Sequence, residues 1–145
     1  MFNTFRNLVE IVTGKEKKVC LFEKEILSAI AMECPKNISK NILYQIDCFN
    51  HINHLDDNRS TLFYSRFRGK NNINSEYLLQ NLPTEFVLGI VTIRNYSGST
   101  ISASVHVVEG QVFEIEYSSS PLKFFEKGFF REIKFFEIKI SGVFL

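Results

Sequence analysis

The spacing of apolar residues changes near the middle of the chain, and this change limits the fold more than any other feature. Before Asp56, apolar side chains recur every three or four residues, as they do on one face of an α-helix. After Asn58, apolar and polar side chains alternate, as they do along a half-buried strand. Helices followed by strands with tight turns predict an α+β fold, with N-terminal helices packed on one face of a C-terminal, mainly antiparallel sheet.

The helical part is expected to cover about residues 1–55 and to contain three helices. We place them at about residues 2–12, from Leu21 to Cys34, and from a cap at Asn37 or Ser39 to Ile52. Gly14 is expected to stop the first helix, since glycine favours the conformation that ends helices. Pro35 is expected to end the second, because the residue before a proline disfavours helical geometry.

The sheet part is expected to cover about residues 60–145. Its predicted strands are Thr61–Phe67, Phe86–Tyr96, Ile101–Val108, Val112–Tyr117 and Phe129–Leu145. Residues 74–82 are predicted to form a loop or a short helix, and Gly142 to bend the last strand. Glu109-Gly110 is expected to form a tight hairpin turn. A chain of 145 residues without an internal repeat predicts one domain, residues 1–145.

Charge and cysteine content exclude several classes of function. The net charge is +1, whereas nucleic-acid-binding domains carry a large basic excess, so we expect no nucleic-acid partner. No apolar run is long enough for a membrane span, and no signal-peptide pattern is present, so we expect a cytoplasmic protein. Cys20, Cys34 and Cys48 have no CxxC spacing, which predicts buried, inert thiols and no zinc site.

His51, His54 and Asp56 form a cluster with residue types that bind metals. Two imidazoles three residues apart can share one helix face, and a carboxylate could complete a site. The zinc motif HExxH, however, needs a spacing of four and an intervening glutamate, which are absent. We therefore interpret the segment as a helix end followed by a turn and predict no metal or cofactor, although metal binding by this cluster stays open.

Two other pairs of side chains have residue types that occur in catalytic sites. His106 shares a strand face with Ser102 and Ser104, but no G-x-S-x-G elbow is present to activate a serine. Cys48 and His51 lie one helical turn apart, but the negative end of a helix dipole disfavours a thiolate there. We therefore predict that the chain is not an enzyme and that its histidines and thiols are structural or surface groups.

The predicted contact surface consists of Asp56, Asp57, Glu114 and Glu116. The two glutamates alternate with Phe113, Ile115 and Tyr117, which we expect to face the core. Paired acids on a rigid strand complement a basic partner and speed association. The alternative is a solvated strand face with Lys or Arg opposite each acid.

The hairpin segment carries a resemblance to known proteins. Residues 103–121, ASVHVVEGQVFEIEYSSSP, combine a strand, a tight Gly turn, an acid-alternating strand and a proline. Together with Ile46–Ile52 and Leu62-Phe63-Tyr64, this arrangement resembles small bacterial immunity proteins of contact-dependent growth inhibition and other polymorphic toxin systems. The resemblance implies an antitoxin-type protein that neutralises a cognate secreted toxin domain, with a nuclease as one candidate, in a one-to-one complex.

Two features bear on how far this resemblance extends. Many immunity proteins against nucleases are strongly acidic, whereas this chain is nearly neutral. No interface residue can be carried over, because these families diverge at the interface. The phenylalanine pairs at 124–125, 129–130 and 135–136 place rings on both faces of their segment, and the face outside the core is either covered by a helix or open as an interface. The alternative to a toxin inhibitor is a homodimeric structural or adaptor module without catalysis.

Overall fold

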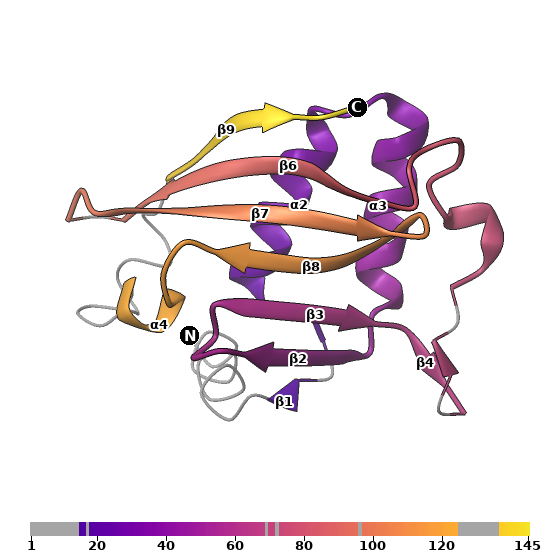
Figure 1. Ribbon diagram of the computed structural model, residues 1–145, viewed down its shortest axis with the longest axis horizontal. Coiled ribbons are helices and arrows are strands. Elements are labelled where there is room, and N and C mark those ends of the chain that lie inside the picture. Colours follow the sequence, from indigo (N-terminus) through magenta and orange to yellow (C-terminus); the bar gives the residue numbers. More distant parts are fainter. Residues whose placement is uncertain (1–14, 17, 69, 72, 96, 125–136) are drawn as a thin grey trace.

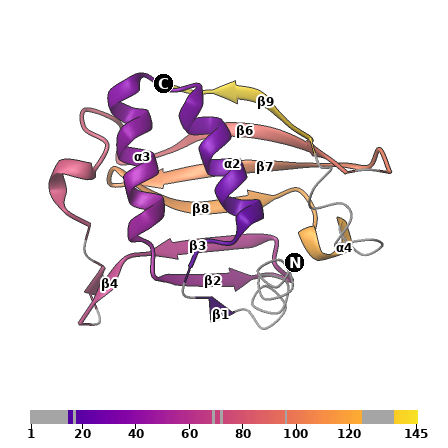
Figure 2. The ribbon, with the colours of Figure 1, turned by 180° about the vertical axis from the view of Figure 1, so that it is seen from behind.

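Two neighbouring helices cover one face of an antiparallel sheet in the computed structural model, which describes residues 15–16, 18–68, 70–71, 73–95, 97–124 and 137–145 (Figures 1 and 2). The helices are α2 (Leu21–Met32) and α3 (Lys36–Cys48). The predicted α+β class, with N-terminal helices on one face of a mainly antiparallel sheet, is confirmed.

The main sheet contains seven strands in the order β1-β2-β3-β8-β7-β6-β9. These strands are β1 (Lys15–Glu16), β2 (His51–Leu55), β3 (Ser60–Tyr64), β6 (Glu85–Arg94), β7 (Thr100–Val108), β8 (Gln111–Tyr117) and β9 (Glu137–Val143). The other described elements are β4 (Arg66–Phe67), β5 (Lys70–Asn71), the 3-10 helix η1 (Ser75–Tyr77) and α4 (Pro121–Phe124). All described strand pairs are antiparallel, and in the main sheet the consecutive strands β2–β3, β6–β7 and β7–β8 pair with each other.

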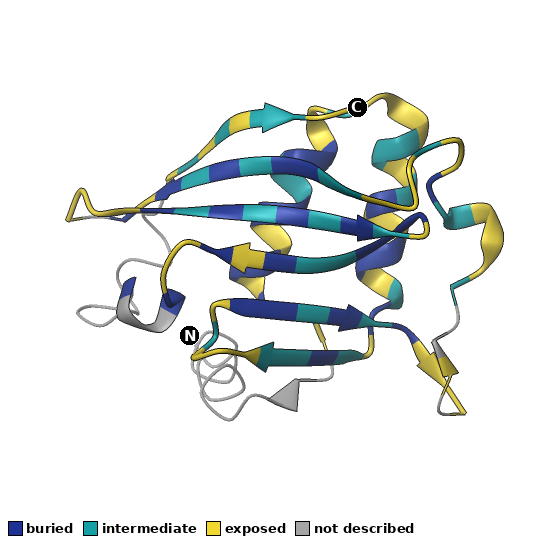
Figure 3. Ribbon diagram, in the orientation of Figure 1, coloured by how far each residue is buried: buried dark blue, intermediate teal, exposed yellow. Residues whose placement is uncertain are grey.

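Burial alternates along the central strands, so one sheet face meets the helices and the other does not (Figure 3). On β7 the buried residues are Ile101, Ala103, Val105 and Val107. The residues between them are half-buried on the opposite face. Both α2 and α3 lie on the first face, and no described helix lies over the centre of the second. We call this second face the open face.

The third helix was predicted wrongly at both ends. It begins after Pro35 rather than at Asn37 or Ser39, and the amide of Ser39 donates a 2.9 Å hydrogen bond to the carbonyl oxygen of Pro35. Proline suits this position because it needs no amide donor there. The helix ends at Cys48, and residues 51–55 form a strand although they fall in the predicted helical part.

Asn50 provides the physical reason for the early helix end. Its side-chain amide donates a 2.8 Å hydrogen bond to the carbonyl oxygen of Arg66 and accepts one of 2.8 Å from the Arg66 amide. Its backbone amide donates to the carbonyl oxygen of Tyr64 at 3.0 Å. These bonds pair residue 50 with the far end of β3, so the chain leaves the helix. Phe49 and Ile52 are both buried, but they lie outside the helix.

Most predicted strands and turns are confirmed. The predicted loop at 74–82 contains η1, and β9 has a bulge at Ser141, beside the bend predicted at Gly142. The first predicted helix, with its stop at Gly14, lies outside the described residues, as do residues 125–136 of the last aromatic region. In the described ranges, no helix combines the length and apolar character needed to cross a membrane.

Candidate functional site

The β7–β8 hairpin places the two predicted glutamates on the open face. Its turn residues Glu109 and Gly110 both have positive φ angles, 50° and 79°, as a two-residue type I′ turn requires. A Cβ atom at Gly110 would lie 2.6 Å from the carbonyl oxygen of Leu79, so glycine is needed there. Glu114 and Glu116 flank a residue that is fully buried under the helices, and both therefore point to the open face.

The turn between β2 and β3 brings the two predicted aspartates to the end of this hairpin. Asp56, Asp57 and Asn58 have φ angles of 51°, 55° and 66°. Asp and Asn tolerate this left-handed conformation better than other residues that carry a Cβ atom. The hydroxyl of Ser120, which follows β8, donates a 2.7 Å hydrogen bond to the carbonyl oxygen of Asp57. This bond ties the turn to the end of β8.

These four carboxylates line one pocket, although the two pairs lie far apart in the sequence. The pocket has a volume of about 600 Å³ and is lined by Asp56, Asp57, Arg59, Ser60, Glu114, Glu116 and Tyr117. We call it the acidic pocket. The structure therefore brings together all four residues that the sequence predicts as a contact surface, and it places a single arginine beside them in the lining.

The carboxylates of the acidic pocket differ in their exposure to solvent and in their hydrogen bonds. The side chain of Glu116 is 59% exposed, and Asp56 and Asp57 are also exposed. Glu114 is half-buried, and its carboxylate accepts a hydrogen bond from the buried Ser60 hydroxyl. Three carboxylates can therefore reach a partner freely, while the fourth is held in place by the neighbouring strand.

The residues that pair with the two glutamates do not match the alternative of a solvated strand face with Lys or Arg opposite each acid. Their cross-strand neighbours are Leu62 and His106 for Glu114, and Ser60 and Ser104 for Glu116. None of these is Lys or Arg. Arg59 lines the pocket, but its Nη2 atom donates to the carbonyl oxygen of Ser118 at 3.4 Å. The pocket therefore carries more negative than positive charge.

A bulge in β8 brings His106 to this site. The register shifts between His106 and Val107, so that His106 lies opposite Glu114 instead of Phe113. Its Nε2 atom lies 3.5 Å from a carboxylate oxygen of Glu116. Phe113 was predicted to face the core, and this is wrong. At the bulge, Phe113 is half-buried and packs edge-on against the ring of Tyr64.

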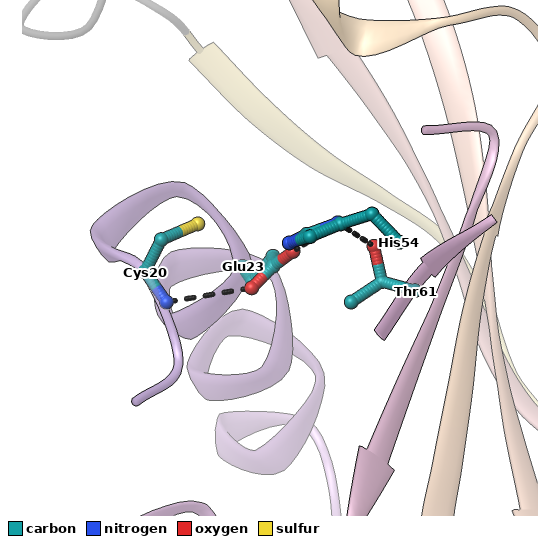
Figure 4. Close-up of polar contacts among 4 residues, drawn as sticks. All are labelled: Cys20, Glu23, His54 and Thr61. Carbon is teal, nitrogen blue, oxygen red and sulfur yellow. Dashed lines mark hydrogen bonds and ion pairs between the residues drawn. The ribbon is translucent and has the colours of Figure 1, made fainter. Parts of the chain in front are cut away.

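The structure does not bring together the two imidazoles of the cluster of His51, His54 and Asp56, because residues 51–55 are a strand rather than a helix. Residues three apart on a strand point to opposite faces. The ring of His51 lies near the ring of Tyr64, with 5.8 Å between their centroids. His54 instead points toward α2 (Figure 4). The two imidazoles therefore cannot bind one ion.

His54 belongs to a buried polar cluster between α2 and the sheet (Figure 4). Its Nδ1 atom lies 3.1 Å from the Thr61 hydroxyl and 3.7 Å from a carboxylate oxygen of Glu23. The other Glu23 oxygen accepts a 3.4 Å hydrogen bond from the amide of Cys20, at the start of α2. The side chains of His54 and Glu23 are each only 2% exposed, so this cluster links helix to sheet and is closed to a substrate.

Acid is expected to destabilise the protein through His54. Burial lowers the pKa of His54 below its ordinary value of 6.5, and the Glu23 carboxylate offsets this only in part. The unfolded chain therefore binds a proton at a higher pH than the folded chain does. The stability contribution is complete above the ordinary pKa and is lost as the pH falls below it, down to the folded-state pKa.

The test compares urea unfolding at about pH 7.5 and about pH 5. His54→Gln is expected to reduce the loss of unfolding free energy between these two values, even if the variant is less stable at both. The matched control is His51→Gln, which removes a half-buried histidine and should leave the acid-induced loss unchanged. Equal pH dependence in the wild type and in His54→Gln would contradict this role.

The other candidate catalytic groups are His106, with its neighbouring serines, and the three cysteines. Ser102 and Ser104 share the open face with His106, as predicted, but the polar contact of His106 is with Glu116. The three cysteines are free; Cys20 is buried and Cys34 and Cys48 are half-buried. Burial, and then the Glu33 carboxylate, raise the pKa of the Cys34 thiol, which lowers its reactivity at neutral pH.

Comparisons of the chain with protein-family models, curated proteins and solved structures found no match.

Proposed function

We propose that this chain is a cytosolic immunity protein, of the antitoxin type, that binds a cognate protein toxin domain and neutralises it without catalysis. The main support is the acidic pocket, where Asp56, Asp57, Glu114 and Glu116 gather at one end of the open face. Charges that converge from separate segments onto one concave surface complement an oppositely charged partner better than scattered charges do.

The scaffold under the pocket favours tight binding. Glu114 and Glu116 lie on the central strand β8, which is paired on both sides. Ile115, between them, is fully buried against the helices, and Ser60 holds the carboxylate of Glu114. A surface that is already ordered loses little conformational entropy when a partner binds. The backbone that carries the two glutamates is therefore ordered before the encounter, and the Glu114 carboxylate is held in place.

The partner expected from this chemistry has a basic, convex surface. Nuclease domains are one such class, because they bind phosphate backbones with Lys and Arg. An acidic protein surface that covers these residues would exclude the nucleic acid. Electrostatic attraction would also speed association, and the association rate should therefore fall as ionic strength rises.

The test is protection from the toxin domain encoded beside this chain. Expression of that domain alone should arrest growth, and co-expression of this chain should restore it. The purified proteins should form a one-to-one complex in calorimetry. Continued growth arrest together with no measurable complex would reject the proposal.

A homodimeric adaptor is the second candidate, and an apolar surface away from the acidic pocket favours it. A shallow hollow of about 600 Å³ is lined by Leu82, Pro83, Phe86, Val87, Ile90, Phe144 and Leu145. Phe144 is 55% exposed and Leu145 is 46% exposed. Exposed apolar patches often mark association surfaces. Light scattering over a range of concentrations separates the candidates, because a dimer with no toxin partner favours the adaptor.

A further inference from the structure

We propose that His106, Glu114 and Glu116 form a binding site for a divalent transition-metal ion, with zinc as the probe ion. One potential ligand atom from each of these residues lies within 4.8 Å of the other two. Among the described residues, no other group of three or more His, Cys, Asp or Glu side chains meets this condition. The inference concerns the isolated chain and does not depend on a toxin partner.

The spacing of the ligand atoms fits a tetrahedral ion. Zinc binds histidine nitrogen and carboxylate oxygen at about 2.1 Å, so two ligands of one tetrahedral ion lie roughly 3.4 Å apart. The Nε2 atom of His106 lies 3.5 Å from a Glu116 oxygen. This pair already has the required separation, and a ligand atom of Glu114 lies within 4.8 Å of both.

The surroundings of the His106 imidazole give a second reason to expect a metal ion. The side chain of His106 is 25% exposed, but its Nε2 atom is itself buried, and no hydrogen-bond partner for this atom lies among the described residues. A buried polar atom without a hydrogen bond is costly, and a metal ion would satisfy its lone pair. This buried nitrogen lies 3.5 Å from a carboxylate oxygen on the neighbouring strand.

The surroundings resemble those of a metal site. Ser60 donates a hydrogen bond to Glu114, and a hydrogen bond of this kind orients a carboxylate that binds a metal ion. Glu116 is 59% exposed and lines the acidic pocket, so an ion can enter and a fourth ligand can come from solvent. An imidazole with two carboxylates favours zinc and related ions over Mg²⁺ and Ca²⁺, which prefer oxygen ligands alone.

The test is a calorimetric titration with zinc chloride. The chain is first freed of metal with a chelator and then dialysed. Serine replacements at Cys34 and Cys48 remove thiols that would also bind zinc. We expect one zinc ion per chain, and at least about tenfold weaker binding in His106→Gln and in Glu116→Gln. Cobalt bound in place of zinc should show a visible spectrum without thiolate bands.

His51→Gln is the matched control, because it removes a histidine that lies outside the site. It should bind zinc as the parent does. Circular dichroism establishes that each variant is folded, and Glu116→Gln changes a largely exposed side chain that the fold does not require. Absence of zinc binding to the parent, or equal binding by His106→Gln and Glu116→Gln, would overturn the proposal.

Discussion

Replacement of Gln45 by methionine is expected to lower the free energy of unfolding by about 3 kcal/mol. Gln45 is fully buried in α3. Its Nε2 atom donates hydrogen bonds of 2.7 Å to the carbonyl oxygen of Tyr77 and 3.0 Å to that of Gly110. Its Oε1 atom accepts a 2.9 Å hydrogen bond from the amide of Val112. One side chain therefore joins α3 to η1 and to the β7–β8 turn.

Methionine is the informative replacement because it has nearly the same length and volume as glutamine. It leaves little cavity, so the change isolates the three hydrogen bonds. The carbonyl oxygen of Gly110 keeps a 2.8 Å hydrogen bond from the Leu79 amide. Each of the other backbone groups that stays buried without a partner costs about 1–3 kcal/mol. The expected total is thus large relative to the stability of an ordinary domain, which is about 5–15 kcal/mol.

Gln80→Met is the matched control for this experiment. Gln80 is exposed, and its Nε2 atom donates one 3.2 Å hydrogen bond to the carbonyl oxygen of Ser75. Its replacement should change stability by no more than about 0.5 kcal/mol. Urea unfolding monitored by circular dichroism gives both values. A loss below about 1 kcal/mol in Gln45→Met would show that the bonds contribute little net stability.

Local pattern was sufficient to predict most of the sheet. Along β7, apolar and polar residues alternate without interruption, and Glu109-Gly110 is a strong turn signal. The same local information failed at the end of α3. There, Phe49 and Ile52 continue the helical spacing, but hydrogen bonds between Asn50 and Arg66, sixteen residues later, decide the structure. Tertiary contacts of this kind are not visible in a short sequence window.

The sequence predicted only part of the candidate site, because the rest depends on tertiary contacts. Glu114 and Glu116 share a face by alternation alone, whereas their approach to Asp56 and Asp57 depends on how β3 pairs with β8. The role of His106 was missed. A regular ladder counted outward from the turn would place His106 opposite Phe113, and only the bulge brings it opposite Glu114.

Reversal of charge at Glu116 is expected to weaken binding to the cognate toxin domain by about a hundredfold. Glu116→Arg places a cation among the remaining carboxylates, where a basic partner surface would meet like charge at a cost of several kcal/mol. The side chain is largely exposed, so the fold should tolerate the change. The dissociation constant from calorimetry and the rescue of growth give two independent readouts.

Glu25→Arg provides the matched control. Glu25 is exposed on α2, on the side of the sheet opposite the open face, and its replacement changes the net charge by the same amount. Long-range attraction depends on total charge, whereas contact depends on position. Glu25→Arg should therefore slow association slightly and leave rescue intact. An equal loss in both variants would assign the effect to net charge rather than to the acidic pocket.

The toxin-binding experiment must be repeated with a metal chelator, because Glu116 would take part both in toxin binding and in the proposed metal site. If the acidic pocket binds the toxin through charge, Glu116→Arg should weaken the complex whether or not the chelator is present. If the ion itself joins the two proteins, the chelator should weaken the wild-type complex, while the variant should be insensitive to it. His106→Gln separates the two cases further, since it removes a metal ligand but retains all four carboxylates of the pocket. Full toxin binding by His106→Gln together with loss in Glu116→Arg would assign recognition to the carboxylates alone.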